Sequence, residues 1–225
     1  MSTLVSIFFN FVSIFAFSYV LWKKLKEDYH HDTIFKFTLT ILAGAGAGWW
    51  VGESWAKDFV FWLVFAGGGG AGYIYLQRLN LKFFEVIDAI SLGTFYFLFL
   101  LYLGRSIILF ALPNYFFIAN ASLSVLLIFL YVYLARDYRG FRWYPSGKVG
   151  FAGLFTLSLF FLGHGLGALV KHFQDPVIFF QYSPLSLSVE VINVIIPLGL
   201  MADIIISLTL FGILTKVLYV RSGRG

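Results

Sequence analysis

The chain contains no cysteine, and only 12% of its 225 residues are charged. The missing cysteines exclude disulfide bonds, a thiolate metal site and a thiol nucleophile supplied by the protein itself. The scarcity of charge, together with 60% hydrophobic and 21% aromatic residues, excludes an ordinary water-soluble domain. The composition therefore predicts an integral membrane protein.

Other common sequence features are also missing. No coiled coil, internal repeat or low-complexity linker is evident, so we expect a single transmembrane domain over residues 1–225. The first apolar stretch has no basic segment before it and no small-x-small cleavage site after it, which favours a retained span over a signal peptide. No hydrolase triad or metal-ligand cluster is found, so we expect neither a metal nor a cofactor.

Apolar stretches of the length that crosses a bilayer, about 20 residues, are abundant in the chain. They run approximately from Leu4 to Trp22, Thr33 to Val51, Phe59 to Leu76, Phe83 to Leu103, Tyr115 to Ala135, Val149 to Val170, and Val189 to Tyr219. The last stretch is long enough to tilt or to kink at Pro197. We therefore predict an all-α, polytopic membrane helix bundle of about seven transmembrane helices.

Basic residues are distributed unevenly between the two sides of this bundle. If the amino terminus is outside, the cytoplasmic side carries all of the 16 lysines and arginines except Lys57, Arg105 and Lys171. The positive-inside rule then places the amino terminus outside and the carboxyl terminus in the cytoplasm. This topology, with contact to anionic lipid headgroups, accounts for the net charge of +5, so no nucleic-acid partner is expected.

Glycine clusters occur in the second and third expected spans. The third contains VFWLVFAGGGGAGYIY, and the second contains LAGAGAGWW with Gly44, Gly46 and Gly48. Small residues allow helix backbones to approach closely in lipid, and Gly68 and Gly72 form one such small-xxx-small pair. The GGGG run is not a nucleotide-binding loop, because no Lys-Ser or Lys-Thr follows it. Two interpretations stay open: helix packing, or a bare backbone that admits a lipid headgroup.

Ionisable side chains in the apolar stretches are better indicators of a site, because a charge at mid-bilayer costs at least about 2.5–3.5 kcal/mol. Arg105 lies at the external end of the fourth span, where it can hold a phosphate or extend to the interface. Asp203 lies in the middle of the seventh span, and Glu190 lies nearer the start of that span. A carboxylate as deep as Asp203 is either protonated or paired, and we expect Arg105 or His164 as its partner.

Three further polar residues have two interpretations each. His164, in FFLGHGLGALV, is either a satisfied packing residue or a general base. Glu85 and Asp88 lie at the cytoplasmic mouth of the fourth span, where helix capping and headgroup-level solvation explain them equally well.

The order of these landmarks resembles the prolipoprotein diacylglyceryl transferase family of bacterial inner membranes. The basic loop WKKLKEDYHHDTIFKF leads into the Gly-rich second span, and Gly67 and Gly68 follow in the third span. A short basic loop then leads to an aromatic-rich stretch with Asp88, and the pair Gly104 and Arg105 closes the fourth span. The segments LPNYFFIA and RDYRGFRWYPSGKVGF are also similar to parts of the family pattern.

The resemblance implies transfer of the diacylglyceryl group of phosphatidylglycerol to the lipobox cysteine thiol of a prolipoprotein. The expected partners are therefore phosphatidylglycerol and a prolipoprotein signal peptide with its lipobox cysteine, and the expected location is a bacterial inner membrane. Arg105 would bind the donor phosphate. His164 would take over as the base in place of lost family positions, with Lys171 or His172 as the second cation. The glycine run would let the headgroup enter between the third and fourth helices. The expected lipid-binding residues are Gly67, Gly68, Gly104, Arg105 and Asp88.

Two alternatives remain, because some positions differ from the family pattern. Ala66 stands where the family has a histidine before its glycine pair, and the segment after Arg105 lacks the family's two asparagines and glutamate. The first alternative is a catalytically inactive relative that binds lipid or a membrane partner. The second is a small transporter that uses Asp203, Glu190 and His164 as a proton or ion path, although no paired broken-helix repeat is present.

Overall fold

The computed structural model of the chain describes residues 2–55, 59–79, 81–108, 115–137, 150–174, 188–191 and 194–219. The helices within these ranges are α1 (Ser2–Leu25), α2 (His31–Trp55), α3 (Val60–Leu79), α4 (Phe83–Ile108), α5 (Tyr115–Asp137), α6 (Phe151–Gln174) and α8 (Leu198–Tyr219). An antiparallel hairpin of β1 (Ser188–Val191) and β2 (Val194–Pro197) precedes α8. Lys57 and residues 138–149 of the basic turn lie outside the described residues.

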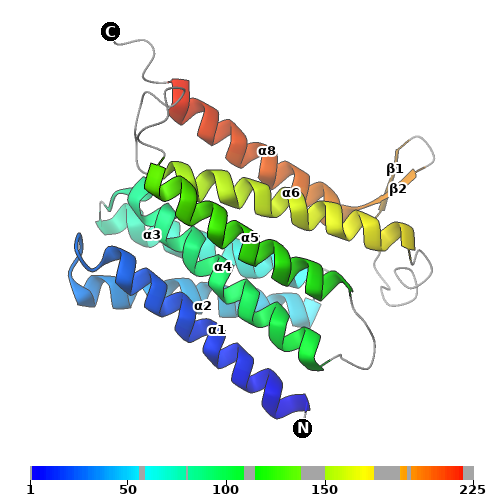
Figure 1. Ribbon diagram of the computed structural model, residues 1–225, viewed down its shortest axis with the longest axis horizontal. Coiled ribbons are helices and arrows are strands. Elements are labelled where there is room, and N and C mark those ends of the chain that lie inside the picture. The colour runs from blue at the N-terminus through cyan, green and yellow to red at the C-terminus, as the bar shows by residue number, and fades with distance from the viewer. Residues whose placement is uncertain are drawn as a thin grey trace.

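The helices lie side by side and alternate in direction, as Figure 1 shows. Helix α1 packs on α4, α4 packs on α5 and α6, and α6 packs on α8. Helices α2 and α3 form a closely packed pair behind this row. The described residues therefore form one up-and-down helical bundle, in which α1 begins and α8 ends at opposite ends.

Four helical segments are long and apolar enough to cross a membrane. They are Leu4–Leu25, His31–Trp55, Phe83–Ile107 and Phe116–Asp137, and shorter apolar segments cover Phe151–Leu166 and Asp203–Ile213. Large apolar side chains such as Phe11, Phe15 and Phe129 face outward from the bundle, where lipid would solvate them. The prediction of a helical membrane bundle is supported, although four segments, rather than seven, meet these criteria within the described residues.

The seventh predicted span begins at the wrong residue. We expected a helix from Val189, but the chain forms the β1–β2 hairpin first, and α8 begins only at Leu198. The β-branched residues of this stretch favour extended backbone, and Pro197, which has no N–H to donate, directly precedes the helix. Glu190, expected inside a transmembrane helix, therefore lies on β1.

Basic residues gather at the end of the bundle where α1, α3, α5 and α8 end and where α2, α4 and α6 begin, called here the basic end. Those in the described helices and turns are Lys23, Lys24, Lys26, Lys36, Arg78, Lys82, Arg136 and Lys216. Arg105 and Lys171 lie in the halves of α4 and α6 nearer the other end, called here the opposite end. The uneven charge that the sequence predicts is thus a property of the folded bundle.

Glycines hold α2 and α3 together along a line called here the glycine seam. A Cβ atom at Gly44 would overlap the Gly67 carbonyl and lie 2.6 Å from the Ala71 Cβ, and one at Gly72 would lie 3.0 Å from Ile41. Contacts of this kind allow two backbones to approach in lipid. The seam consists of Gly44, Gly48, Gly67, Gly68 and Gly72.

The packing interpretation of the glycines is therefore supported, with two refinements. Gly46, Gly69 and Gly70 lie outside the seam, because a Cβ at any of them would meet nothing within 4 Å. Gly67 and Gly68 face α2, which differs from the expectation that they open a path between the third and fourth helices.

Candidate functional site

A buried histidine–carboxylate pair joins α6 to α8. The Nδ1 atom of His164 lies 3.0 Å from Oδ2 and 3.2 Å from Oδ1 of Asp203. The two residues are 8% and 1% exposed. One turn further along α8, Ser207 donates a hydrogen bond of 2.9 Å to the carbonyl of Ser158 on α6. The expectation that Asp203 is paired is confirmed, and its partner is His164.

The geometry of this pair defines which imidazole nitrogen can react. With Asp203 ionised, Nδ1 of His164 carries a proton and donates a hydrogen bond to the carboxylate, which can only accept. Nε2 is then the nitrogen that can take up a proton, and it has no hydrogen-bond partner among the described residues. A carboxylate that fixes the tautomer and orientation of a histidine is a recurring arrangement around general bases.

Four aromatic side chains surround His164 and form what we call the aromatic shell. The Phe61 ring stacks on the imidazole at 4.4 Å with an interplanar angle of 9°. The rings of Trp62, Phe116 and Phe160 lie 5.9, 5.7 and 5.8 Å away. This shell shields the pair from water, which strengthens the electrostatic interaction between the imidazole and the carboxylate.

Sequence reasoning missed the aromatic shell. Its members come from the start of α3, the start of α5 and the middle of α6, and only the fold brings them together. The only signal in the sequence is the aromatic run beginning at Phe61, which does not by itself distinguish a site from lipid contact.

Arg105 lies near the end of α4 and faces outward from the bundle. Its guanidinium carbon lies 5.8 Å from the centre of the Phe117 ring on α5. The preceding residue, Gly104, is buried against α1, because a Cβ there would lie 2.5 Å from the Cβ of Phe9. Gly104 thus lets α1 and α4 approach each other, and Arg105 projects beside that contact.

Arg105 does not pair with Asp203, although the sequence offered it as a possible partner. It is nevertheless a neighbour of the histidine through two consecutive aromatic residues. Phe117 contacts Arg105, and Phe116 contacts His164. The two predicted catalytic residues therefore lie in the same region of the bundle.

Asp88 joins α4 to the start of α6. Its Oδ2 accepts a 2.8 Å hydrogen bond from the N–H of Gly150, and its Oδ1 accepts one of 2.7 Å from Gly153. Gly150 has a φ of 98°, which favours glycine, and a Cβ at Gly153 would lie 2.8 Å from Asp88 Oδ1 and from Ser91 Oγ. Asp88 thus caps α6 through Gly150, which lies 62 residues after it in sequence.

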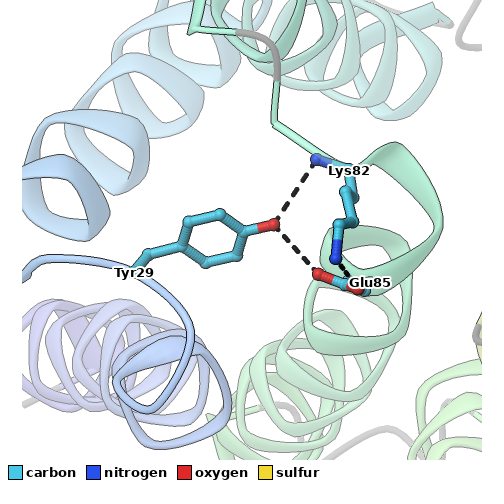
Figure 2. A network of polar contacts seen from close by, with 3 residues as sticks. All are labelled: Tyr29, Lys82 and Glu85. Carbon is cyan, nitrogen blue, oxygen red and sulfur yellow. Dashed lines mark hydrogen bonds and ion pairs between the residues drawn. The ribbon is translucent and has the colours of Figure 1, made fainter.

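A network that the sequence did not predict links two turns at the basic end, as Figure 2 shows. The Tyr29 hydroxyl donates to Glu85 Oε2 at 3.1 Å and accepts from the Lys82 N–H at 3.4 Å. The Lys82 Nζ lies 3.0 Å from Glu85 Oε1. These contacts connect the turn between α1 and α2 to the beginning of α4.

Two groups of this network, the Tyr29 hydroxyl and the Lys82 ammonium, have raised pKa values. Burial raises the pKa of Tyr29 above 10.0, the Lys82 N–H opposes this rise, and Glu85 adds to it. The hydrogen bond and the negative charge of Glu85 raise the pKa of Lys82 above 10.5. Tyr29 and Lys82 are therefore both protonated at neutral pH.

Comparisons with protein-family models, curated proteins and solved structures gave no match for this chain. The family resemblance stays a prediction. The functional assignment consequently depends on the histidine–carboxylate pair, its aromatic shell and the neighbouring arginine.

Proposed function

We propose that the protein is a membrane-embedded transferase that moves the diacylglyceryl group of phosphatidylglycerol to the lipobox cysteine thiol of a prolipoprotein. The observation that carries this proposal is the buried pair of His164 and Asp203. A thiol acceptor needs a base, and an imidazole oriented by a carboxylate is well suited to remove its proton. The missing cysteines of the chain are consistent with this chemistry, because the substrate supplies the sulfur.

The second requirement of the reaction is an anion-binding group. Arg105 is exposed at the edge of the bundle, where a lipid phosphate can reach it laterally from the outer leaflet. A guanidinium offers several donors in one plane, which suits a phosphate better than a lysine ammonium does. Arg105 would hold the donor headgroup and stabilise the phosphate as it leaves.

The proposed step balances as follows. His164 Nε2 takes the thiol proton, and the sulfur attacks the carbon of the diacylglyceryl group that is bonded to a phosphate oxygen. A carbon–sulfur bond forms, the carbon–oxygen bond breaks, and glycerol phosphate leaves with the bonding electrons. The proton passes from His164 to the departing phosphate or to water. Asp203 stays ionised and holds the imidazolium in place.

The same proposal fixes an orientation in the membrane. In a bacterial inner membrane, the basic end would face the cytoplasm. The amino terminus would then lie outside the cell and the carboxyl terminus in the cytoplasm. The opposite end, with Arg105, would then lie in the outer leaflet. Cysteines introduced at Ser2 and Ser222, labelled from outside in intact cells, test this orientation: only the first should react.

Reconstitution tests the activity directly. Purified protein in vesicles with headgroup-labelled phosphatidylglycerol and a lipobox peptide should produce a thioether-linked peptide and labelled glycerol phosphate. Arg105→Gln should reduce turnover strongly, whereas Arg78→Gln, the same change at the basic end, should not. Absence of product with the unaltered protein, together with lipid binding that Arg105→Gln does not weaken, would exclude the transferase and leave an inactive relative.

A second candidate function is supported by the polar contacts between α6 and α8. The pair of His164 and Asp203 and the bond between Ser207 and Ser158 place several protonatable or polar groups along one helix interface. Such a row can carry protons in a small transporter. A pH-driven proton flux into vesicles that Asp203→Asn abolishes, in the absence of any transfer product, would favour this candidate.

A further inference from the structure

Tyr102 is a buried polar residue that the proposed reaction does not yet use. It lies on α4 one turn before Arg105 and is only 5% exposed. Its hydroxyl has no hydrogen-bond partner among the described residues. A buried donor without a partner is uncommon in folded proteins and requires an explanation.

Aromatic contacts connect Tyr102 to the neighbours of both the arginine and the histidine. Its ring lies 6.1 Å from Phe117, the ring over which the Arg105 guanidinium is positioned. It also lies 6.5 Å from Phe116, the ring that contacts His164. Tyr102 therefore shares one aromatic neighbour with each of the two groups to which the proposed function gives chemical roles.

Several other buried hydroxyls in the described helices are satisfied within their own helix. Serines and threonines on several helices donate to the carbonyl four residues earlier, for example Thr38, Ser91, Ser124, Thr156 and Ser158. A tyrosine cannot do this, because its hydroxyl lies too far from its own backbone. A phenol buried in this position must find an acceptor from outside its helix, and leaving it without one costs free energy.

We propose that Tyr102 is a ligand-binding residue, whose hydroxyl donates a hydrogen bond to an oxygen of the phosphate ester that Arg105 neutralises. This inference rests on the proposed function for the role of Arg105, but it concerns binding and needs no turnover. A phenol and a guanidinium together give a phosphate one neutral and one charged donor. The position of Tyr102 would direct the bound ester toward His164 and the carboxylate beside it.

The test is a comparison of Tyr102→Phe with Tyr96→Phe, the same change two turns earlier on α4. Each protein is placed in phosphatidylcholine vesicles containing increasing fractions of photoactivatable phosphatidylglycerol, and the labelled fraction of protein is measured. Loss of one hydrogen bond to a charged oxygen should raise the half-saturating lipid fraction about tenfold for Tyr102→Phe. The half-saturating lipid fraction should stay unchanged for Tyr96→Phe.

A thermal measurement separates ligand binding from a structural role. Since the Tyr102 hydroxyl has no partner among the described residues, Tyr102→Phe should unfold in pure phosphatidylcholine at the temperature of the unaltered protein or slightly above it, because the substitution removes an unsatisfied buried donor. Phosphatidylglycerol should raise this temperature for the unaltered protein and much less for the variant. A lower unfolding temperature of Tyr102→Phe in phosphatidylcholine, or equal labelling of both variants and the unaltered protein, would overturn the inference.

Competition identifies the source of the phosphate ester. If the site takes the lipid itself, water-soluble glycerol phosphate should displace the labelled lipid only weakly. If the site takes the free ester, glycerol phosphate should displace the lipid at concentrations similar to that of the lipid. Tyr102→Phe should weaken the binding of whichever ligand the site takes. Failure of the unaltered protein to produce thioether, with binding still dependent on Tyr102, would reject the transferase and retain this site. Turnover by Tyr102→Phe with an unchanged KM would retain the transferase and reject the role of Tyr102 in binding.

Discussion

The two ends of the bundle use polar residues in different ways. At the basic end, both oxygens of Asp88 and the hydroxyl of Tyr29 are bonded to backbone N–H groups or to a neighbouring side chain. At the opposite end, His164 Nε2 and the Tyr102 hydroxyl have no partner in the part of the chain that the structure describes. Both lie among aromatic rings.

This difference separates scaffold from site. A polar group whose hydrogen bonds are all made inside the protein fixes one helix against another and has nothing left for a ligand. A polar group that is buried but incompletely bonded is costly, and it persists where a substrate completes the bonding. We therefore interpret Asp88 and Tyr29 as parts of the scaffold, and His164 and Tyr102 as parts of the proposed site.

The largest expected effect comes from breaking the pair of His164 and Asp203. His164→Gln should reduce transfer about 10²–10⁴-fold, because it removes the proposed general base. His164→Leu alone should also destabilise the fold by about 3–5 kcal/mol, since it leaves a buried carboxylate unpaired. The double variant with Asp203→Leu should recover stability but no activity, as thermal unfolding and product formation would show. Recovery of activity in the double variant would show that His164 and Asp203 are needed only for stability and not for transfer.

A smaller effect is expected at the glycine seam, which the sequence left open between packing and lipid entry. Gly44→Ala should destabilise the fold by up to about 3 kcal/mol, because the added methyl group meets the α3 backbone. Gly46→Ala should be neutral or slightly stabilising, since nothing lies within 4 Å of the new Cβ and alanine favours the helix. Unfolding temperatures of the two variants measure the difference. Equal unfolding temperatures would show that the glycine seam does not contribute to the stability of the fold.

The next effect concerns the Asp88 cap of α6. Asp88→Asn replaces one accepting oxygen by an NH₂ group, so one backbone N–H of α6 loses its partner at a cost of about 1–3 kcal/mol. Transfer per folded molecule and half-saturating phosphatidylglycerol should stay unchanged. Glu27→Asn, a change at an exposed carboxylate of the same end, is the control. Weaker lipid binding by Asp88→Asn alone would restore the lipid-binding role predicted from the sequence.

The smallest effect is expected from Tyr29. Tyr29→Phe should lower the free energy of unfolding by about 0.5–1.5 kcal/mol, because two hydrogen bonds of a partly exposed hydroxyl are lost. Tyr19→Phe, on an exposed tyrosine of α1, is the matched control and should change little.

Alkaline pH provides a second measurement of the same network. The pKa values of Tyr29 and Lys82 are both raised in the fold, so folding favours the protonated forms. Their contribution to stability is complete below pH 10.0 and is lost as the pH rises through the folded pKa values. Tyr29→Phe should reduce this alkaline loss, which unfolding temperatures measured from pH 9 upward would reveal. An identical pH profile for the variant would contradict the assignment.

Hydropathy predicted the helices well because span length is imposed by the bilayer. The start of α4 at Phe83 and of α5 at Tyr115 agree with the sequence, while the start of the last helix does not. There, Val189 to Pro197 is as apolar as a span, and hydropathy cannot distinguish an apolar hairpin from a helix. β-branched residues and a proline were the available signals.

The site was predictable only in part. Asp203 and His164 could be paired from sequence, since few ionisable groups lie in the apolar stretches and a buried carboxylate needs a partner. The stacking of Phe61 on His164 and the position of Tyr102 depend on which faces of α3, α4 and α6 meet. With 28 phenylalanines and 13 tyrosines in the chain, composition gives no means of selecting these rings.

The contact of Tyr29 with Lys82 and Glu85 has a consequence for the order of assembly during biosynthesis. All three residues are synthesised before α5, so the first four helices can complete this connection while the later helices are still on the ribosome. Asp88 is already in place at that stage, and it meets its two glycine N–H groups only when α6 emerges. The amino-terminal half of the bundle can thus form a surface on which the half that carries His164 and Asp203 later packs.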